Sequence, residues 1–216
     1  MKQLIVYDLD GTLVDTLEDI AASANHMRAE LGLPLLPARQ IRGYIGQGLH
    51  ELVRHCLHTE DPKLVEQGTK IYRRHYTLHL LDHSRLYPHA PSVLAYFKGR
   101  RQAVITNKPN PYSRDILTAL GIADFFFDII GGNSAYPKKP DPTSLLALMA
   151  SERIDPTEAL FVGDSPIDIE TGRKAGVFTV TVTHGLSDRA ELVHAQPDLL
   201  VSDFQEFLEA ARHHQW

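Results

Sequence analysis

The stretch MKQLIVYDLDGTLV, residues 1–14, places a short apolar run directly in front of two acidic residues, Asp8 and Asp10. The run at residues 4–7 is typical of a strand that is buried on both faces. An isolated carboxylate is costly to bury, so these acids require a cation or hydrogen-bond donors beside them. The carboxyl end of a parallel strand, where α/β sheets bind their ligands, can supply both. The sequence therefore predicts that the chemistry takes place here.

Composition excludes several classes of protein. Of the 216 residues, 43% are apolar and 23% are charged, which is typical of a globular protein with a sizeable core. A net charge of −5 argues against a protein that binds nucleic acid or a membrane surface. Cys56 is the single cysteine, so no internal disulfide can form, and no targeting segment precedes the first strand. We expect a cytoplasmic monomer or homodimer.

The chain after the opening strand falls into two regions. The first has helical periodicity and no strand pattern, and we expect helices at about residues 16–31, 45–58 and 62–81. From about residue 86, short β runs alternate with helices. The expected strands are 102–106, 126–130, 160–162, 177–182 and 199–201. The expected helices between and after them are 90–98, 112–120, 143–153, a segment ending near 175, and 204–211.

This alternation predicts the fold class. Strands separated by helices imply right-handed βαβ units, and hence an α/β, Rossmann-like parallel sheet with helices on both faces. The opening strand belongs to the same sheet, because alone it could not be buried. We therefore expect a discontinuous α/β catalytic core at residues 1–14 and 83–216. An all-helical cap domain is inserted at residues 15–82.

Polar residues follow several of the expected strands. They are Asp8 and Asp10, Thr106 and Asn107, Lys138 and Lys139, and Asp164 with Asp168. The carboxyl ends of parallel strands meet at one edge of a sheet, so these side chains can converge. Several carboxylates in one crevice repel each other unless a divalent cation lies among them, and ligands that are all oxygen favour Mg²⁺. A lysine, a threonine hydroxyl and backbone N–H groups beside that metal suit a phosphoryl group.

An aspartate can act as the nucleophile in phosphoryl transfer and form an aspartyl-phosphate. A second acid two residues later could protonate the leaving oxygen and then activate water. The metal and the lysine would neutralise charge on the transferring group.

The motifs resemble a known superfamily when they are taken together. The run Asp8–Thr16 is similar to the signature of the haloacid dehalogenase-like (HAD) hydrolases. The second, third and fourth motifs of that family are matched, in order, by Thr106-Asn107, Lys139-Pro140-Asp141-Pro142 and Gly163-Asp164-Ser165-Pro166-Ile167-Asp168. The insert after the first motif resembles the small helical cap of the family. Residues 42–48, RGYIGQG, are similar to a segment of its phosphoglycolate phosphatase branch.

The resemblance implies a role for each matched residue. Asp8 would be the nucleophile and Asp10 the general acid/base. The ligands of Mg²⁺ would be Asp8, the backbone carbonyl of Asp10, and Asp164, supported by Asp168. Thr106, Asn107 and Lys139 would bind phosphate, with Lys138 as the competitor for the lysine role. Arg42, Gly46 and Gly48 are the candidate cap contacts to substrate, and the two glycines suggest a flexible lid.

The expected function is a Mg²⁺-dependent phosphatase acting on a small phosphorylated metabolite, with phosphoglycolate as the first candidate. A sugar phosphomutase of the β-phosphoglucomutase type, a nucleotidase and a pyrophosphatase remain alternatives. Mutases of that type tend to carry Val where this chain has Thr12, which favours hydrolysis. A non-catalytic regulatory relative is a further alternative, although every catalytic position is intact.

Two other features have simpler interpretations. His75 and His79 would share one helix face, but the glutamate of the zinc-protease pattern is missing beside the first of them. We interpret them as part of a polar helix face. Cys56 falls on an amphipathic helix of the cap, and we expect it to be a small core residue.

Overall fold

The fold is described from a computed structural model that covers all residues, 1–216. The main sheet is six-stranded, in the order β5-β4-β1-β6-β7-β8, and every pairing in it is parallel. Its strands are β1 (Leu4–Tyr7), β4 (Arg101–Ile105), β5 (Asp128–Ile130), β6 (Ala159–Gly163), β7 (Phe178–Val182) and β8 (Leu199–Val201). The predicted α/β fold with a parallel sheet is confirmed.

Strand β1 lies in the middle of the sheet, between β4 and β6. All four of its residues are fully buried, which explains the uninterrupted apolar run. Leu4 and Val6 face one hydrophobic cluster, while Ile5 and Tyr7 face the other. Asp8 is therefore held at the end of the most deeply buried strand.

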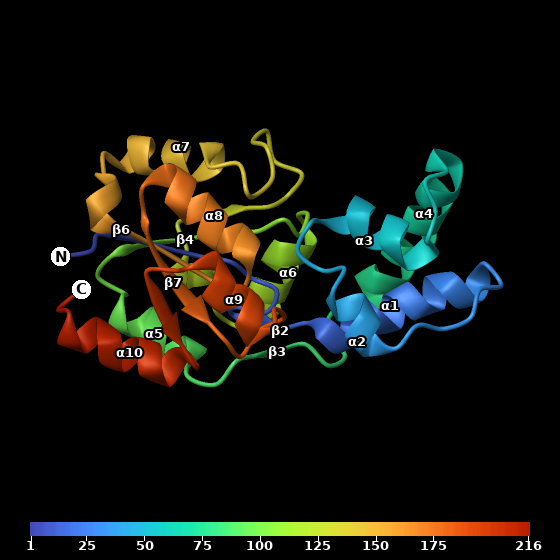
Figure 1. Cartoon of the computed structure of the whole chain (residues 1–216), viewed down its shortest axis with the longest axis horizontal. Helices are drawn as coiled ribbons and strands as arrows, with labels where there is room; N and C mark the ends of the chain where they lie inside the picture. Colours follow the sequence, from blue (N-terminus) through green and yellow to red (C-terminus); the bar gives the residue numbers. More distant parts are fainter.

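Helices cover both faces of this sheet (Figure 1). They are α5 (Ala90–Tyr96), α6 (Tyr112–Ala119), α7 (Thr143–Glu152), α8 (Pro166–Ala175), α9 (Arg189–Ala195) and α10 (Phe204–His213). Two 3₁₀ turns, η1 (Ala123–Phe125) and η2 (Pro156–Glu158), lead into β5 and β6. Helices α7 and α8 supply the cluster on one face, whereas α5, α6 and α10 pack on the other. None of the helices combines the length and apolar character needed to cross a membrane.

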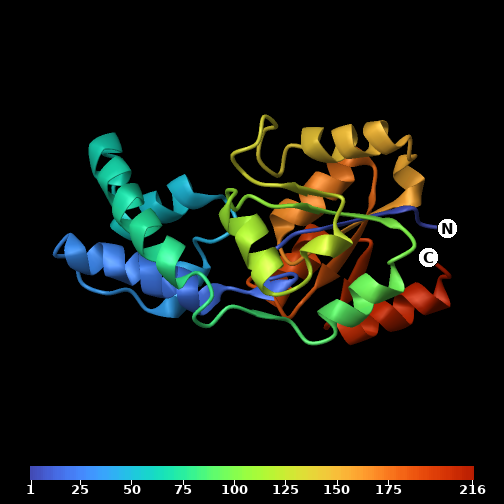
Figure 2. The same ribbon diagram turned by 180° about the vertical axis from the view of Figure 1, so that it is seen from behind.

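The cap consists of α1 (Leu17–Glu30), α2 (Ala38–Arg42), α3 (Leu49–Leu57) and α4 (Pro62–His79). It stands at one end of the core, opposite the chain termini, as both views show (Figures 1 and 2). Helix α4 packs against both α1 and α3. Cys56 is fully buried inside the cap, as predicted, and burial raises the pKa of its thiol to about 12.

The chain enters and leaves the cap through two adjacent short strands. Strands β2 (Val14–Asp15) and β3 (Arg85–Leu86) form an antiparallel pair. Asp19, buried in the first turn of α1, accepts hydrogen bonds from the backbone N–H groups of His83 and Ser84 and from the Ser84 hydroxyl. A carboxylate bonded to this many donors ties the two connections firmly together.

Several predicted boundaries were wrong, each for a local reason. The helix expected from residue 45 begins at Leu49, because Gly46 and Gly48 have φ angles of 112° and 92°. The strand expected from residue 126 begins at Asp128, since η1 occupies the preceding residues. Helices α2 and α9 and the β2–β3 pair were not predicted, because such short elements carry too little periodicity.

Candidate active site

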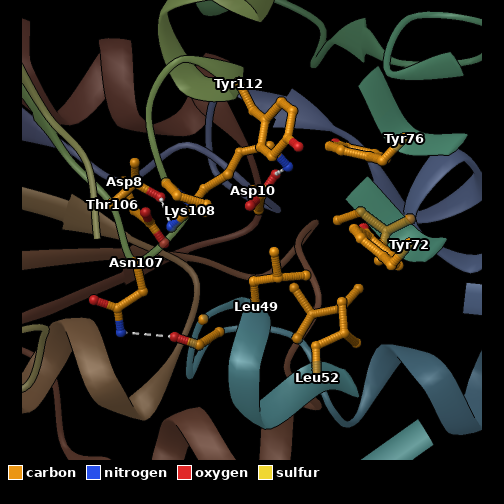
Figure 3. Close-up of a pocket in the computed structure, with 15 residues that line it drawn as sticks. Asp8, Asp10, Leu49, Leu52, Tyr72, Tyr76, Thr106, Asn107, Lys108 and Tyr112 are labelled. Atoms are coloured by element: carbon orange, nitrogen blue, oxygen red, sulfur yellow. Dashed lines mark hydrogen bonds and ion pairs between the residues drawn. The ribbon is translucent and has the colours of Figure 1, made fainter. Parts of the chain in front are cut away.

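The predicted site residues gather at the carboxyl ends of β1, β4 and β6, where the cap meets the core. Asp8 follows β1, Thr106 and Asn107 follow β4, and Asp164 follows β6. A pocket lies between these strand ends and the cap helices (Figure 3). The convergence expected from a parallel sheet is therefore present.

Three buried carboxylates form the centre of the site. Oxygen atoms of Asp8, Asp164 and Asp168 lie within 4.8 Å of one another. Lys139 is the cation among them, with Nζ 2.6 Å from Asp168 Oδ1 and 2.8 Å from Asp8 Oδ1. The contact of Lys139 with Asp8 is an ion pair without hydrogen-bond geometry, so Asp8 Oδ1 accepts no hydrogen bond.

The electrostatics of the cluster follow from its burial. Desolvation raises the pKa of Asp8 to about 6, and Lys139 opposes that shift. Desolvation and the charges of Asp168 and Asp8 raise the pKa of Asp164 well above its ordinary value. For Lys139, burial acts to lower the pKa, but Asp168 and Asp8 outweigh it and hold the pKa above its ordinary value. One lysine thus faces three carboxylates, so the cluster lacks positive charge.

This donor set fits a divalent cation. The cluster offers carboxylate oxygens and contains neither histidine nor cysteine, which suits a hard cation. The cluster has too little positive charge for its carboxylates, and the buried Asp8 Oδ1 accepts no hydrogen bond. A bound cation would satisfy both. Close packing preserves the arrangement, because a Cβ at Gly11 (φ 83°) would collide with the Asp164 carboxylate.

Asp164 and Asp168 are held by different partners. Asp164 accepts hydrogen bonds from the Thr12 hydroxyl and the Leu186 backbone N–H, both at 2.7 Å. Asp168 uses Oδ1 for Lys139, while Oδ2 accepts from the Ser165 hydroxyl and from the backbone N–H of Asp164. Because both of its oxygens are engaged, Asp168 positions Lys139 and the Asp164 loop.

Asp10 faces the cap side of the pocket. Its Oδ1 accepts hydrogen bonds from the Thr16 hydroxyl at 2.7 Å and from Lys108 Nζ at 2.9 Å. Thr16 occupies the N-cap position of α1, but its hydroxyl donates to Asp10 and makes no hydrogen bond to the first turn of the helix. The entry to the cap is thereby connected to the second acid of the site.

The lysine at the site is Lys139. Its side chain is buried between Asp8 and Asp168, whereas Lys138 is exposed. A Cβ at Gly48 would lie 2.8 Å from Lys138 Nζ, so that lysine reaches the cap rather than the carboxylates.

Asn107 braces the site with its side chain. Its amide Nδ2 donates to the backbone carbonyls of Gly46 (2.8 Å) and Lys139 (3.0 Å), and its Oδ1 accepts from the Lys139 N–H. The amide predicted to bind phosphate is therefore bonded to the lid segment and to the lysine loop. Thr106, also buried, accepts from the Lys108 N–H and lines the pocket beside Asp8 (Figure 3).

The three candidate cap contacts are separated by the structure. Gly46 and Gly48 line the pocket, next to the strand ends. Arg42 does not line it. Its guanidinium donates to the backbone carbonyls of Gly185, Leu186 and Ser187, and so attaches the cap to the loop that holds Asp164.

Several residues of the pocket were not singled out from the sequence. Lys108 is buried and lies against Asp10. Tyr72 and Tyr76 line the pocket from α4 of the cap, and Tyr112 lines it from α6 of the core. Lys108 had a signal, since it directly follows Thr106-Asn107 at a strand end. The tyrosines had none, because nothing local distinguishes a helix position that faces a pocket from one that faces the core.

The histidine face of α4 is a stack. The rings of His75 and His79 lie 4.2 Å apart, and His26 stacks on His75 at 4.1 Å. His75 Nδ1 is hydrogen-bonded to Ser23, and His79 Nδ1 to Asp82. These contacts agree with the interpretation as a polar helix face.

Known proteins share both the sequence pattern and the fold. The family model described as haloacid dehalogenase-like hydrolase matches residues 5–182. The chain belongs to this family, which makes it an enzyme, and its relatives place it among the phosphatases of that family.

Proteins named phosphoglycolate phosphatase are similar to nearly the whole chain. One from Neisseria meningitidis is 37% identical over 96% of this chain and 92% of its own length. Another, from Vibrio cholerae, is 34% identical over 96% of each. The crystal structure of a predicted phosphoglycolate phosphatase from Haemophilus somnus superposes with a TM-score of 0.93 at 31% identity, covering 97% of this chain and 98% of that one. The fold, including the cap, is therefore that of this group.

Proposed function

We propose that this protein is a Mg²⁺-dependent phosphatase that hydrolyses a small phosphate monoester through an aspartyl-phosphate on Asp8. The observation that carries the proposal is the buried cluster of Asp8, Asp164 and Asp168 around Lys139, with Asp10 beside it at the pocket. A Mg²⁺ ion held by Asp8, the Asp10 backbone carbonyl and Asp164 would withdraw charge from the phosphoryl oxygens and keep Asp8 ionised.

The reaction divides into two displacements on phosphorus. A carboxylate oxygen of Asp8 attacks the phosphorus, the ester P–O bond breaks, and the leaving oxygen takes a proton from Asp10. Asp10, now ionised, then takes a proton from water as that water attacks the same phosphorus. The bond between Asp8 and phosphorus breaks, inorganic phosphate leaves, and both acids return to their starting states.

Other groups of the site would hold the phosphoryl oxygens. Lys139 provides the buried positive charge, and Thr106 lies beside Asp8. The backbone N–H groups of Leu9 and Asp10 donate to no acceptor within the chain, so they are available to a phosphoryl oxygen. Asn107 contributes by holding the Lys139 loop and Gly46 in place.

We propose phosphoglycolate as the substrate, on the strength of the relatives that carry this name. The size of the pocket favours a compact substrate, since its cavity volume is about 50 Å³. Thr12 favours hydrolysis by resemblance, because mutases of the β-phosphoglucomutase type tend to carry valine at this position. In this structure the Thr12 hydroxyl donates to Asp164, a bond that valine could not make.

Metal removal gives the direct test. With Mg²⁺ in excess, we expect phosphoglycolate to be hydrolysed faster than hexose phosphates, nucleoside monophosphates or pyrophosphate. Excess EDTA should abolish turnover reversibly. Release of inorganic phosphate is the measurement. Full activity after exhaustive chelation would contradict the metal requirement, and conversion of one hexose phosphate into another without phosphate release would favour a mutase.

Substitution of Asp10 tests its role in both displacements on phosphorus. In Asp10→Asn we expect turnover to fall by about 10²- to 10⁴-fold, because neither the leaving oxygen nor the water exchanges its proton with a carboxylate. A substrate with a good leaving group needs less acid assistance, so an aryl phosphate should allow a phosphorylated enzyme to accumulate. Mass spectrometry of the quenched enzyme measures it. Wild-type turnover of phosphoglycolate by Asp10→Asn would remove Asp10 from this role.

A further inference from the structure

Lys108 is a buried cation that the proposed reaction does not use. It is 7% exposed, and Nζ lies 2.9 Å from Asp10 Oδ1. The same ammonium group lies 4.7 Å from the centre of the Tyr76 ring. It is the only positively charged residue that lines the pocket, because Lys139 lies behind Asp8, between the buried carboxylates.

Tyr76 presents a buried hydroxyl without a partner. The residue is 1% exposed and lines the pocket, yet its Oη makes no hydrogen bond. The neighbouring Tyr112 differs, since its hydroxyl pairs with Thr77 Oγ1 at 3.3 Å. Burial raises the pKa of Tyr76 well above its ordinary value, so the group remains a hydroxyl that can donate. A buried donor left unpaired is unfavourable, which points to an acceptor brought by a ligand.

The two groups lie together on the cap side of Asp10. Figure 3 shows Tyr76 next to the Lys108 ammonium, which lies over the face of its ring, with Asp10 beside them and Asp8 farther into the core. Much of the pocket wall near the cap is apolar, formed by Ile20, Ile45, Leu49 and Leu52. A ligand whose phosphoryl group is at Asp8 would therefore meet a mostly apolar wall with its other end, in which Lys108 supplies the charge and Tyr76 a buried hydroxyl without a partner.

We propose that Lys108 and Tyr76 form an anion site that binds the carboxylate of a compact phosphate ester. This inference rests on the proposed phosphatase function and specifies its substrate class. One positive charge, shared with Asp10, suits a singly charged carboxylate better than a second phosphate dianion. One oxygen of the carboxylate accepts from Lys108 and the other from Tyr76. The site thus selects acidic esters over neutral ones of the same size.

The test compares two substrates that differ only at this end. Phosphoglycolate carries the carboxylate, and 2-hydroxyethyl phosphate replaces it with a neutral alcohol. We expect the ratio of their kcat/KM values to fall by about 10- to 100-fold in Lys108→Met and by about 10-fold in Tyr76→Phe, as expected for hydrogen bonds to a charged group. Lys98→Met, at an exposed lysine of the core, is the matched control and should leave the ratio unchanged.

Tyr76→Phe removes a single oxygen, so it keeps the test valid if Lys108→Met proves unstable. A parallel loss with both substrates would overturn the proposal, because it would mean that Lys108 acts on Asp10 rather than on the carboxylate. An unchanged ratio in both variants would overturn it as well.

A binding measurement distinguishes failure of the anion site from failure of the proposed phosphatase function. In an Asp8→Asn background, calorimetric titration with phosphoglycolate should show affinity at least about 10-fold weaker when Lys108→Met is added. If the wild type hydrolyses neither ester, the proposed function fails, and the titration still decides the anion site. Equal affinity with and without Lys108 would reject that site even in an active phosphatase.

Discussion

Asp8→Asn is expected to lower phosphatase turnover by at least about 10³-fold while the protein remains folded. An amide is a poor nucleophile and cannot form the aspartyl-phosphate. Stability should not fall, because Lys139 keeps its 2.6 Å pair with Asp168 and one of three mutually repelling carboxylates is removed. The measurements are phosphate release with Mg²⁺ and thermal unfolding without it.

Asp124→Asn is the matched control, since it makes the same chemical change at an exposed residue of the core. It should retain wild-type turnover. Retention of wild-type turnover by Asp8→Asn, with both phosphoglycolate and an aryl phosphate, would show that the nucleophile is another residue. Mass spectrometry adds a second criterion, because no phosphorylated protein should appear in Asp8→Asn under any conditions.

Lys139→Met is expected to affect both stability and activity. Removing the buried ammonium group leaves Asp8 and Asp168 without their cation, and breaking a buried ion pair on one side costs about 3–5 kcal/mol. Loss of the same charge from the phosphoryl site should lower kcat by about 10²- to 10³-fold. Denaturant unfolding in EDTA measures the first effect, and added Mg²⁺ should restore part of the lost stability.

Lys138→Met provides the control, because this neighbouring lysine is exposed and points to Gly48. It should unfold at the wild-type denaturant concentration and retain turnover within a few-fold. If Lys138→Met lost more activity than Lys139→Met, the assignment of the phosphate-binding lysine would have to be reversed.

Local patterns were sufficient to predict the layout of the core. An apolar run as short as β1 can be buried only in the middle of a sheet, and the alternation of strands and helices after residue 86 requires parallel pairing. Parallel pairing in turn brings the residues after β1, β4 and β6 to one edge. Asp8, Asp10 and Asp164 could therefore be located from sequence, because their positions depend on strand ends alone.

The direction and partner of each side chain depended on tertiary contacts. Thr16 donates to Asp10 rather than to the first turn of its helix, and Arg42 contacts the loop at residues 185–187 rather than the pocket. The side-chain amide of Asn107 donates its hydrogen bonds to the backbone carbonyls of Gly46 and Lys139. In each case a polar side chain could satisfy its hydrogen bonds in more than one way, and only the packing of cap against core selects among them.

The sequence by itself determined the fold class, the insertion of a helical cap and the acids at the strand ends, because strand burial and chain order are local properties. The motif resemblance favoured Lys139 over the adjacent Lys138, and the structure gives the physical reason, because Lys139 is the one buried between Asp8 and Asp168. The tertiary structure alone decided which residues line the cap side of the pocket. Lys108 and Tyr76 lie on separate parts of the chain, and their contact exists only when the cap rests on the core.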